Sequence, residues 1–438
     1  MKKFFTWKNF IKLLGLLVLL CALAYFLADR ARLHAGEIFN RQMTKYSATL
    51  GKIKVQKIWA DVFGNVYFDK LTWSDFQGNP VLEAKSGRIR ISVFDVIFKT
   101  IGLGSVRELE LHQPVICIGF DEDMHLYFLE HEKKEARKQL HEHKPVTLNK
   151  QFFKDRVPDV RLILKDATLS VDYPGRQFIF HDLDMQANIT NHENLELQLS
   201  TDRFDGSIIG DGMQLSGKVK FLKQGTEGRL NLALYEVVPA SLGLGKINLP
   251  MTVYGDVSGE LKSPIIKGAV SMRELKLPPL IFRKLQGNYE YNQGKIILDD
   301  VTGTILGGNV EATGVYYFDE RSYQLNIIGR DLMAGAALKD NKLRCRADLN
   351  LRMNCEGPGK PVYSYGAVTS EGGSYSLIPF SHLSASFSNV ERELDFTNVE
   401  LDTPFGTFKT DALEINHGKV KLNPIYLVEE NGKVELVK

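Results

Sequence analysis

The sequence predicts an all-β protein, and three observations lead to that prediction. The first is residues 343–355, where apolar and polar side chains alternate without exception. The second is a series of shorter alternating segments from about residue 50 onward, separated by Gly, Asn, Asp and Pro at the spacing typical of sandwiches, barrels and open sheets. The third is a pattern of several strands that recurs at a fixed offset. We expect an elongated, mostly antiparallel sheet with one or two short helices.

The segment 343–355 predicts one long strand with an apolar face and a charged face, because successive side chains of a strand point to opposite sides. The apolar face has no carboxylate, His, Lys or Arg, so it offers nothing for acid/base chemistry. It is either one wall of a closed sandwich core or a surface that contacts the hydrocarbon of a ligand. Its residues are Leu343, Cys345, Ala347, Leu349, Leu351, Met353 and Cys355.

The repeat relates residues that are 98 positions apart, since 366 − 268 = 98. Gly268-Ala269-Val270 recurs as Gly366-Ala367-Val368, and a fainter copy precedes the first by 102 residues. Stacked units of this kind share a continuous apolar interior. The matching apolar positions predicted to line it are Phe282 and Phe380, Leu285 and Leu383, and Tyr289 and Phe387.

The N-terminus predicts a membrane anchor at 10–28, because lysines precede an apolar run that approaches the length needed to cross a bilayer. Because these lysines precede the apolar run, we expect residues 1–9 to stay in the cytoplasm and the residues after the anchor to be exported. The alternative is a cleaved signal peptide, since Ala22-Leu23-Ala24 resembles a cleavage site. The 55 Lys and Arg nearly balance the 53 Asp and Glu, so a nucleic-acid partner is poorly supported.

Two segments have a helical or charged pattern in place of the β pattern. Residues 94–101 form a short amphipathic helix candidate, which either plugs one end of the sheet or admits lipid near the inner membrane. Residues 130–150 have the composition of a charged linker, within which 130–144 is either a charged helix or a flexible linker. The histidines in and beside it lack a metal-ligand spacing, so we expect no metal site there.

No other motif indicates catalysis or a cofactor. Residues 303–309 share only their glycines with a phosphate loop and predict a β turn, because no Gly-Lys-Ser/Thr ending follows. No Gly-x-Ser-x-Gly elbow is present. Cys345 and Cys355 lie about 33 Å apart along one strand, too far to form a disulfide with each other. A pairing of Cys117 with one of them stays open, although free buried thiols are the expectation.

The order of these features resembles the AsmA-like proteins of diderm bacteria, the relatives of TamB and YhdP. The resemblance rests on patterned strands and turns over nearly the whole exported chain. It comprises the N-terminal anchor and the segments at 59–68, 71–84, 89–91, 106–116 and 282–314.

The resemblance implies an inner-membrane protein whose periplasmic part is a taco-like β-groove that binds acyl chains. It further implies a role in phospholipid transport between inner and outer membrane and in envelope integrity, without catalysis or cofactor. The expected partners are phospholipid or another acyl lipid, the inner membrane, and another envelope protein that completes the path. The expected parts are the tail 1–9, the anchor 10–28, the cap of the groove 29–129, the linker 130–150 and the groove units 151–438, with repeats near 264–314 and 362–412.

Two other classes of function stay open. The chain could be an assembly factor for outer-membrane proteins, acting by strand pairing at an exposed edge such as 434–437. An envelope hydrolase is the second class, although the sequence supplies no cluster of carboxylates or of Ser and His for it.

Overall fold

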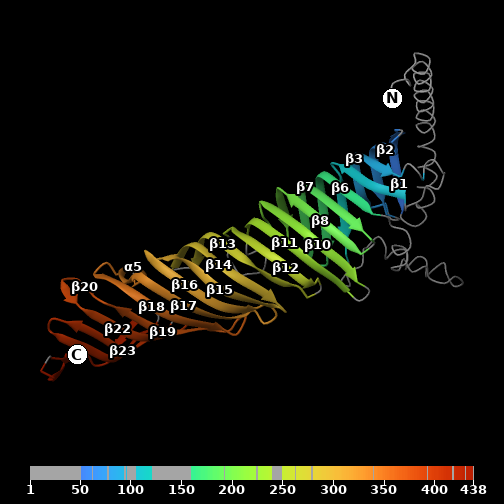
Figure 1. Cartoon of the computed structure of the whole chain (residues 1–438). Helices are drawn as coiled ribbons and strands as arrows, with labels where there is room; N and C mark the ends of the chain where they lie inside the picture. The colour runs from blue at the N-terminus through green and yellow to red at the C-terminus, as the bar shows by residue number, and fades with distance from the viewer. Residues whose placement is uncertain are drawn as a thin grey trace, which may run out of the picture. The chain divides into compact units, whose positions relative to one another are not determined.

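The computed structural model describes residues 51–92, 95, 105–120, 159–238 and 249–437, except for 62, 76–77, 192, 223–224, 262, 278–279, 339, 392, 417–418 and 430. Over these residues the fold is all-β and the strand pairs are mostly antiparallel, which confirms the predicted fold class at that level. Two compact units are present, Met1–Leu230 and Asn231–Lys438, named unit 1 and unit 2 below. Figure 1 labels their strands and colours them by residue number.

Several predicted segments lie outside the described residues. They are the tail 1–9, the anchor 10–28, nearly all of the helix 94–101 and the linker 130–150 with its histidines. Within the described part of the chain, no helix is both long enough and apolar enough to cross a membrane. The one helix described there is α5 (Ala334–Leu338), a single short turn that the sequence did not predict.

Unit 1 begins with an antiparallel ladder, in which β1 pairs with β2, β2 with β3, and β3 with β4. The next strand in space, β6, runs parallel to β4 and β5. The antiparallel order then resumes through β7, β8 and β10. The strands are β1 (Lys52–Ala60), β2 (Asn65–Ser74), β3 (Pro80–Ile91), β4 (Val106–His112), β5 (Val115–Gly119), β6 (Val160–Tyr173), β7 (Arg176–Thr190), β8 (Asn194–Thr201), β9 (Arg203–Gly206) and β10 (Gly212–Leu222), and β11 (Gly225–Val237) contains the unit boundary.

Unit 2 is an antiparallel series of long strands joined by short turns. Leu306 and Gly307 form one such turn, both with positive φ, and confirm the predicted turn at 303–309. The strands are β12 (Met251–Glu260), β13 (Ile265–Leu277), β14 (Leu280–Asn292), β15 (Lys295–Ile305), β16 (Gly308–Tyr317), β17 (Ser322–Met333), β18 (Leu343–Cys355), β19 (Val362–Ser370), β20 (Gly373–Tyr375), β21 (Ile378–Phe380), β22 (His382–Val390), β23 (Glu393–Thr403), β24 (Gly406–Asn416), β25 (Lys419–Leu422), β26 (Tyr426–Val428) and β27 (Val434–Leu436).

The strand registers of unit 2 follow the 98-residue offset. Gly268 faces Tyr289 on the neighbouring strand, and Gly366 faces Phe387. Likewise Tyr289 faces Leu298, and Phe387 faces Phe396. The fainter upstream correspondence differs in layout, because Gly206 ends β9 whereas its counterpart Gly308 begins β16.

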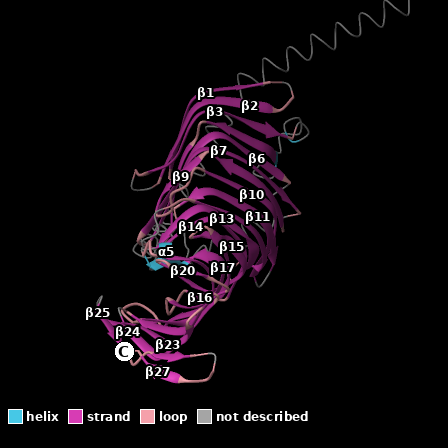
Figure 2. Cartoon of the chain, turned by 90° about the vertical axis from the view of Figure 1, so that its left-hand side faces the viewer, coloured by secondary structure: helices cyan, strands magenta, loops and turns pink. Residues whose placement is uncertain are grey.

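A single polar residue with positive φ interrupts many of the strands. Each is followed directly by an apolar residue and, except for Asp331, lies between two apolar residues three positions apart, as Lys284 does between Phe282 and Leu285. In a regular strand a spacing of three would place the two apolar side chains on opposite faces. The strand register shifts at each of these residues except Lys70, so the inserted residue acts as a β-bulge that restores a common face and increases the local bend of the strand. Figure 2 shows that the strands are bent. These residues are Lys70, Asp166, Asp182, Lys284, Asp300, Asp331 and Asn398.

The apolar faces of the two units are buried to different extents. Unit 1 has a core of six buried residues, among which Leu183 and Ala167 are 0 % exposed, and twelve partly buried side chains pack against it. Unit 2 has a smaller cluster of three buried residues, Ile305, Val310 and Leu332. Most of the remaining apolar side chains on that face of unit 2 are only partly buried.

Candidate functional site

The strand predicted at 343–355 is present with those bounds as β18. Its seven odd positions are buried or partly buried, and its even positions are exposed apart from Asn354, which is partly exposed. The predicted separation into an apolar and a polar face is therefore confirmed. β17 and β19 lie on either side of β18 and extend both faces.

The apolar face continues across unit 2 as rows of residues that face one another on successive strands. One row crosses eleven strands, contains no ionisable side chain, and is partly exposed at every position except the buried Gly287. At about 4.8 Å per strand it extends roughly 48 Å. Its members are Val253, Val270, Gly287, Val301, Ala312, Ile327, Leu351, Gly366, Phe387, Phe396 and Leu413.

The structure places the other predicted site residues on the same face of unit 2. Phe282 packs against the Ile305, Val310 and Leu332 cluster, together with Leu349. Phe387 contacts Phe396, with ring centroids 6.2 Å apart. The other members differ in burial: Phe380 is only 5 % exposed, whereas Leu285, Tyr289 and Leu383 are partly exposed.

Glycines let the large side chains of this face lie flat. A Cβ on Gly255 would be only 2.9 Å from the Tyr289 hydroxyl, so the tyrosine lies over the glycine. A Cβ on Gly303 would be 2.7 Å from a methyl group of Leu285. These positions need glycine because a neighbouring side chain already occupies the space of the Cβ.

The electrostatics of the face are those of an apolar surface. Burial raises the pKa of the Cys345 thiol, and burial likewise raises the pKa of the Tyr289 hydroxyl. Cys345, Cys355 and Cys117 are free thiols. A small polar point interrupts the face where the Asn389 amide lies 3.4 Å from the Ser364 hydroxyl and donates a hydrogen bond to it.

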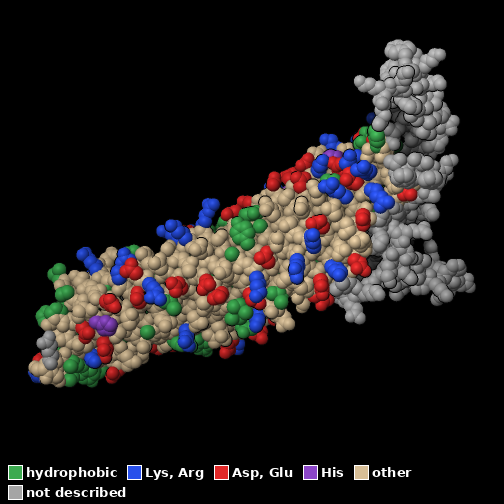
Figure 3. All heavy atoms as spheres, in the orientation of Figure 1, with side chains coloured by type: hydrophobic (Ala, Val, Ile, Leu, Met, Phe, Trp, Pro, Cys, Tyr) green, Lys and Arg blue, Asp and Glu red, His purple; other side chains and the backbone are tan. Residues whose placement is uncertain are grey.

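Charged side chains occupy the opposite side of β18, where Arg344, Arg346 and Arg352 are exposed. The molecular face drawn in Figure 3 carries basic and acidic side chains interspersed with each other. Such a mixture gives no single-sign field to attract a nucleic acid or another polyion.

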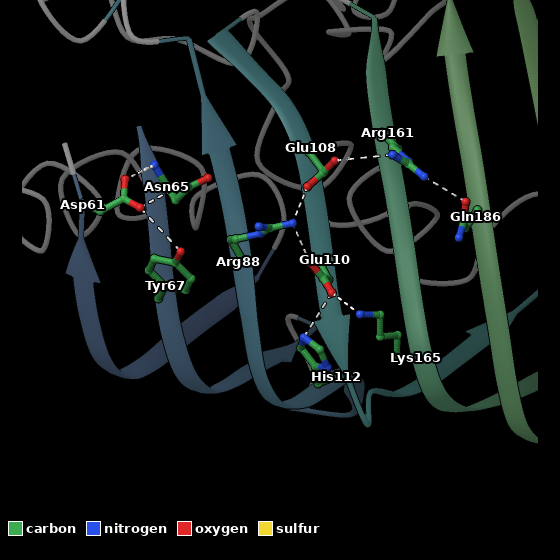
Figure 4. Close-up of polar contacts among 10 residues, drawn as sticks. All are labelled: Asp61, Asn65, Tyr67, Arg88, Glu108, Glu110, His112, Arg161, Lys165 and Gln186. Atoms are coloured by element: carbon green, nitrogen blue, oxygen red, sulfur yellow. Dashed lines mark hydrogen bonds and ion pairs between the residues drawn. The ribbon is translucent and has the colours of Figure 1, made fainter. Parts of the chain in front are cut away.

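Unit 1 contains a second candidate, an ionic network that sequence reasoning missed (Figure 4). Arg88 on β3 donates to Glu108 at 2.6 Å and to Glu110 at 2.7 Å, both on β4. Lys165 on β6 lies 2.6 Å from the other carboxylate oxygen of Glu110, and His112 lies 3.3 Å from that oxygen. Arg161 extends the network to Gln186 on β7.

This network stabilises the place where the sheet changes from antiparallel to parallel pairing, since it joins β3, β4 and β6. The hydrogen bond from Lys165 and the nearby positive charges lower the pKa of the Glu110 carboxyl. The charged groups are paired with one another, so the arrangement supports a structural role. The alternation of Glu108, Glu110 and His112 is a sequence pattern that indicates a charged strand face. The sequence does not show which basic residues lie opposite them.

Among the described residues, no group of three or more His, Cys, Asp and Glu side chains could hold a metal ion. Comparisons with protein-family models, with curated proteins and with solved structures found no match. The geometry of the chain itself therefore carries the functional argument. The eleven-residue row is a continuous, partly exposed apolar surface without ionisable side chains, and such a surface can bind apolar chains by excluding water from both surfaces.

Proposed function

We propose that this chain binds acyl chains along the apolar face of unit 2 and assists phospholipid transport between the inner and outer membrane. The observation that carries the proposal is the eleven-strand row, which is apolar throughout and partly exposed. Apolar surface removed from water contributes about 25 cal/mol per Å², so an acyl chain on this face would be held in proportion to the apolar area that it covers. The resemblance to AsmA-like proteins points to the same function.

The proposal places the anchor 10–28 in the inner membrane and the β units in the periplasm, where the apolar face forms an open groove. Lipid tails would move along the row while the headgroups stay hydrated at a rim. This arrangement avoids burying an unpaired charged phosphate, which costs many kcal/mol. The groove provides binding and a path, and no catalytic group is required.

The proposal is tested by photo-cross-linking from alternate positions of β18. A photoreactive amino acid at Leu351 or Met353 should capture phospholipid in cells, whereas the same residue at Asn350 or Arg352, on the opposite face, should not. The alternation is the control, because neighbouring positions share the same strand and differ only in the face they occupy. Equal capture from both faces, or none from either, would contradict acyl binding at this face.

One observation favours the second function, a scaffold for outer-membrane proteins. β27 pairs with β26 alone among the described strands, and Val434 and Leu436 on it are 59 % and 66 % exposed. A free apolar edge can accept another strand. Residues 433 and 437 bond to the residues that flank β26, so the N–H of Leu436 faces the free edge. Leu436→Pro removes this backbone donor, and a loss of envelope integrity with normal lipid cross-linking at Leu351 would favour the scaffold.

A further inference from the structure

A row of tyrosines lies at one end of the apolar face of unit 2. Tyr291, Tyr316 and Tyr323 belong to one register row, in which Tyr291 and Tyr316 both face Ile296 of the strand between them. Tyr316 faces Tyr323 directly, and Tyr323 faces the buried Cys355. The three rings therefore continue the apolar face to the ends of β14, β16 and β17.

The rings of this row are packed, and their hydroxyl groups are free to bind. Phe318 contacts both Tyr291 and Tyr316 edge-on, with centroid distances of 6.0 and 5.1 Å. All three tyrosines are partly buried. Within the described part of the chain, no hydrogen bond engages their hydroxyls. Burial raises the pKa of the Tyr323 hydroxyl, so it stays a neutral donor.

The opposite end of the same strands is closed. Ile305, Val310 and Leu332 are 5–7 % exposed there, and Ala347 is 4 % exposed. The face therefore has one dry end and one end lined with hydroxyls. Tyrosine has this amphipathic character at membrane interfaces, where its ring lies in hydrocarbon and its hydroxyl reaches the polar layer.

The charges around the tyrosine row are balanced. Residues 292–295, 318–321 and 356–361, at the strand ends beside the row, contain three basic and three acidic side chains. A neutral rim of this kind gives no net attraction to an anionic headgroup. The charged residues are Lys295, Arg321, Lys360, Asp319, Glu320 and Glu356.

We infer that Tyr291, Tyr316 and Tyr323 bind the glycerol-ester and phosphodiester region of a zwitterionic glycerophospholipid, whose acyl chains run along the strands toward Ile305, Val310 and Leu332. This inference rests on the proposed acyl binding and adds an orientation and a headgroup class. One acyl chain is about 15 Å long, half of the roughly 30 Å hydrocarbon core of a bilayer. At about 3.3 Å per residue it reaches from Tyr323 to about Ile327 on β17, within the apolar face.

The test uses the full-length protein and vesicles that contain a zwitterionic phosphatidylcholine or an anionic phosphatidylglycerol. Each lipid carries a photoreactive diazirine, either at the end of an acyl chain or on the headgroup. In the wild-type protein we expect acyl-end cross-links near Ile327 and Leu351, headgroup cross-links near 318–323, and a higher yield with phosphatidylcholine. Reversed positions of the two labels, or a preference for phosphatidylglycerol, would overturn the inference.

The decisive variant replaces all three tyrosines of the row with phenylalanine, which keeps the rings and removes the hydroxyls. We expect about a tenfold loss of phosphatidylcholine cross-linking. The matched control replaces Tyr254, Tyr363 and Tyr365, which are 43–51 % exposed, in the same way and should leave the yield unchanged. Normal cross-linking by the row variant would overturn the tyrosine assignment alone, whereas a wild-type protein without acyl cross-links would overturn the proposed function as well.

Discussion

The two units are built from the same kind of strand and bury their apolar faces differently. In unit 1, Phe68, Leu111 and Leu183 are at most 2 % exposed and belong to one core. In unit 2 the corresponding apolar rows are mostly partly exposed, and its buried cluster is confined to one end of the strands. The comparison shows that an alternating strand does not by itself specify a closed core. A closed core stabilises the fold, whereas a partly exposed face remains available to a ligand.

The largest expected effect comes from placing a charge on each face. Leu183→Asp should unfold unit 1, because an unpaired buried charge costs several kcal/mol against a total stability of about 5–15 kcal/mol. Leu351→Asp should leave unit 2 folded, since its carboxylate can be hydrated at a partly exposed position. The same variant should interrupt acyl cross-linking at Met353.

The free cysteines allow each unit to be followed separately. Cys117 lies in β5 of unit 1, and Cys355 is buried in unit 2. We expect Leu183→Asp to expose Cys117 to a thiol reagent and Leu351→Asp to leave Cys355 protected, with Asn350→Asp as the control on the opposite face. Rapid labelling of Cys355 in Leu351→Asp would show instead that the apolar face of unit 2 is a closed core.

The second prediction compares two phenylalanines related by the 98-residue offset. Phe380→Ala should destabilise unit 2 by about 3–5 kcal/mol, because the ring is nearly fully buried. Phe282→Ala should cost less, about 2 kcal/mol, since its ring is partly exposed. Urea unfolding followed by labelling of Cys345 and Cys355 measures both values. Equal losses would contradict the difference in burial between the two positions.

The third prediction concerns the ionic network of unit 1. The pKa of Glu110 is lowered in the folded state, chiefly by the hydrogen bond from Lys165, so its contribution is present above the ordinary carboxyl pKa. That contribution is lost as the pH falls through the lowered pKa. Glu110→Gln should therefore cost about 1–2 kcal/mol at neutral pH, a modest figure because Arg88 and Lys165 are partly exposed. The difference from wild type should shrink in acid.

Tryptophan fluorescence reports on this change, because Trp59 and Trp73 lie in β1 and β2 of unit 1. Glu400→Gln in unit 2, followed by thiol labelling of Cys355, is the matched control. Glu400 lies 2.8 Å from Lys409, but both side chains are nearly half exposed, so no measurable change is expected. A difference between Glu110→Gln and wild type that grew at low pH would reverse the predicted sign and reject the assignment.

The sequence predicted where strands lie better than it predicted which side chains share a face. The bounds of β18 follow from alternation alone, because a two-residue period survives in any strand with one buried side. Phe282 and Leu285 were matched to their counterparts, yet their spacing of three conflicts with that period. The positive φ of Lys284 resolves the conflict. The two-residue alternation does not predict that one residue has a positive φ. An apolar-x-polar-apolar spacing within a strand is the local pattern that indicates such a residue.

The tyrosine row and the Glu110 network depend on the register between paired strands, which could not be predicted from the sequence. Tyr316 and Tyr323 are close in sequence, but Tyr291 joins them only because β15 places Ile296 between the strands. Glu110 meets Lys165 through a parallel pairing between strands separated by the long segment 113–159. Contacts of this range are set by the whole sheet and leave little local trace.

The smallest expected effect concerns the left-handed residues that interrupt strands of both units. Lys70 in unit 1 and Lys284 in unit 2 adopt nearly the same left-handed conformation, with φ of 51° and 52°. A non-glycine residue in this conformation costs about 1–2 kcal/mol of stability, and glycine removes that cost. Glycine also makes the unfolded chain more flexible, which reduces the benefit by about 0.5–1 kcal/mol. Lys70→Gly and Lys284→Gly should each stabilise their unit by about 0.5 kcal/mol, measured by tryptophan fluorescence for unit 1 and by thiol labelling for unit 2. Similar gains would mean that the left-handed conformation is a local property of the strand, independent of whether its apolar face is closed or open. A gain in one unit and a loss in the other would mean that packing against the apolar face determines this conformation, and that the packing differs between the units.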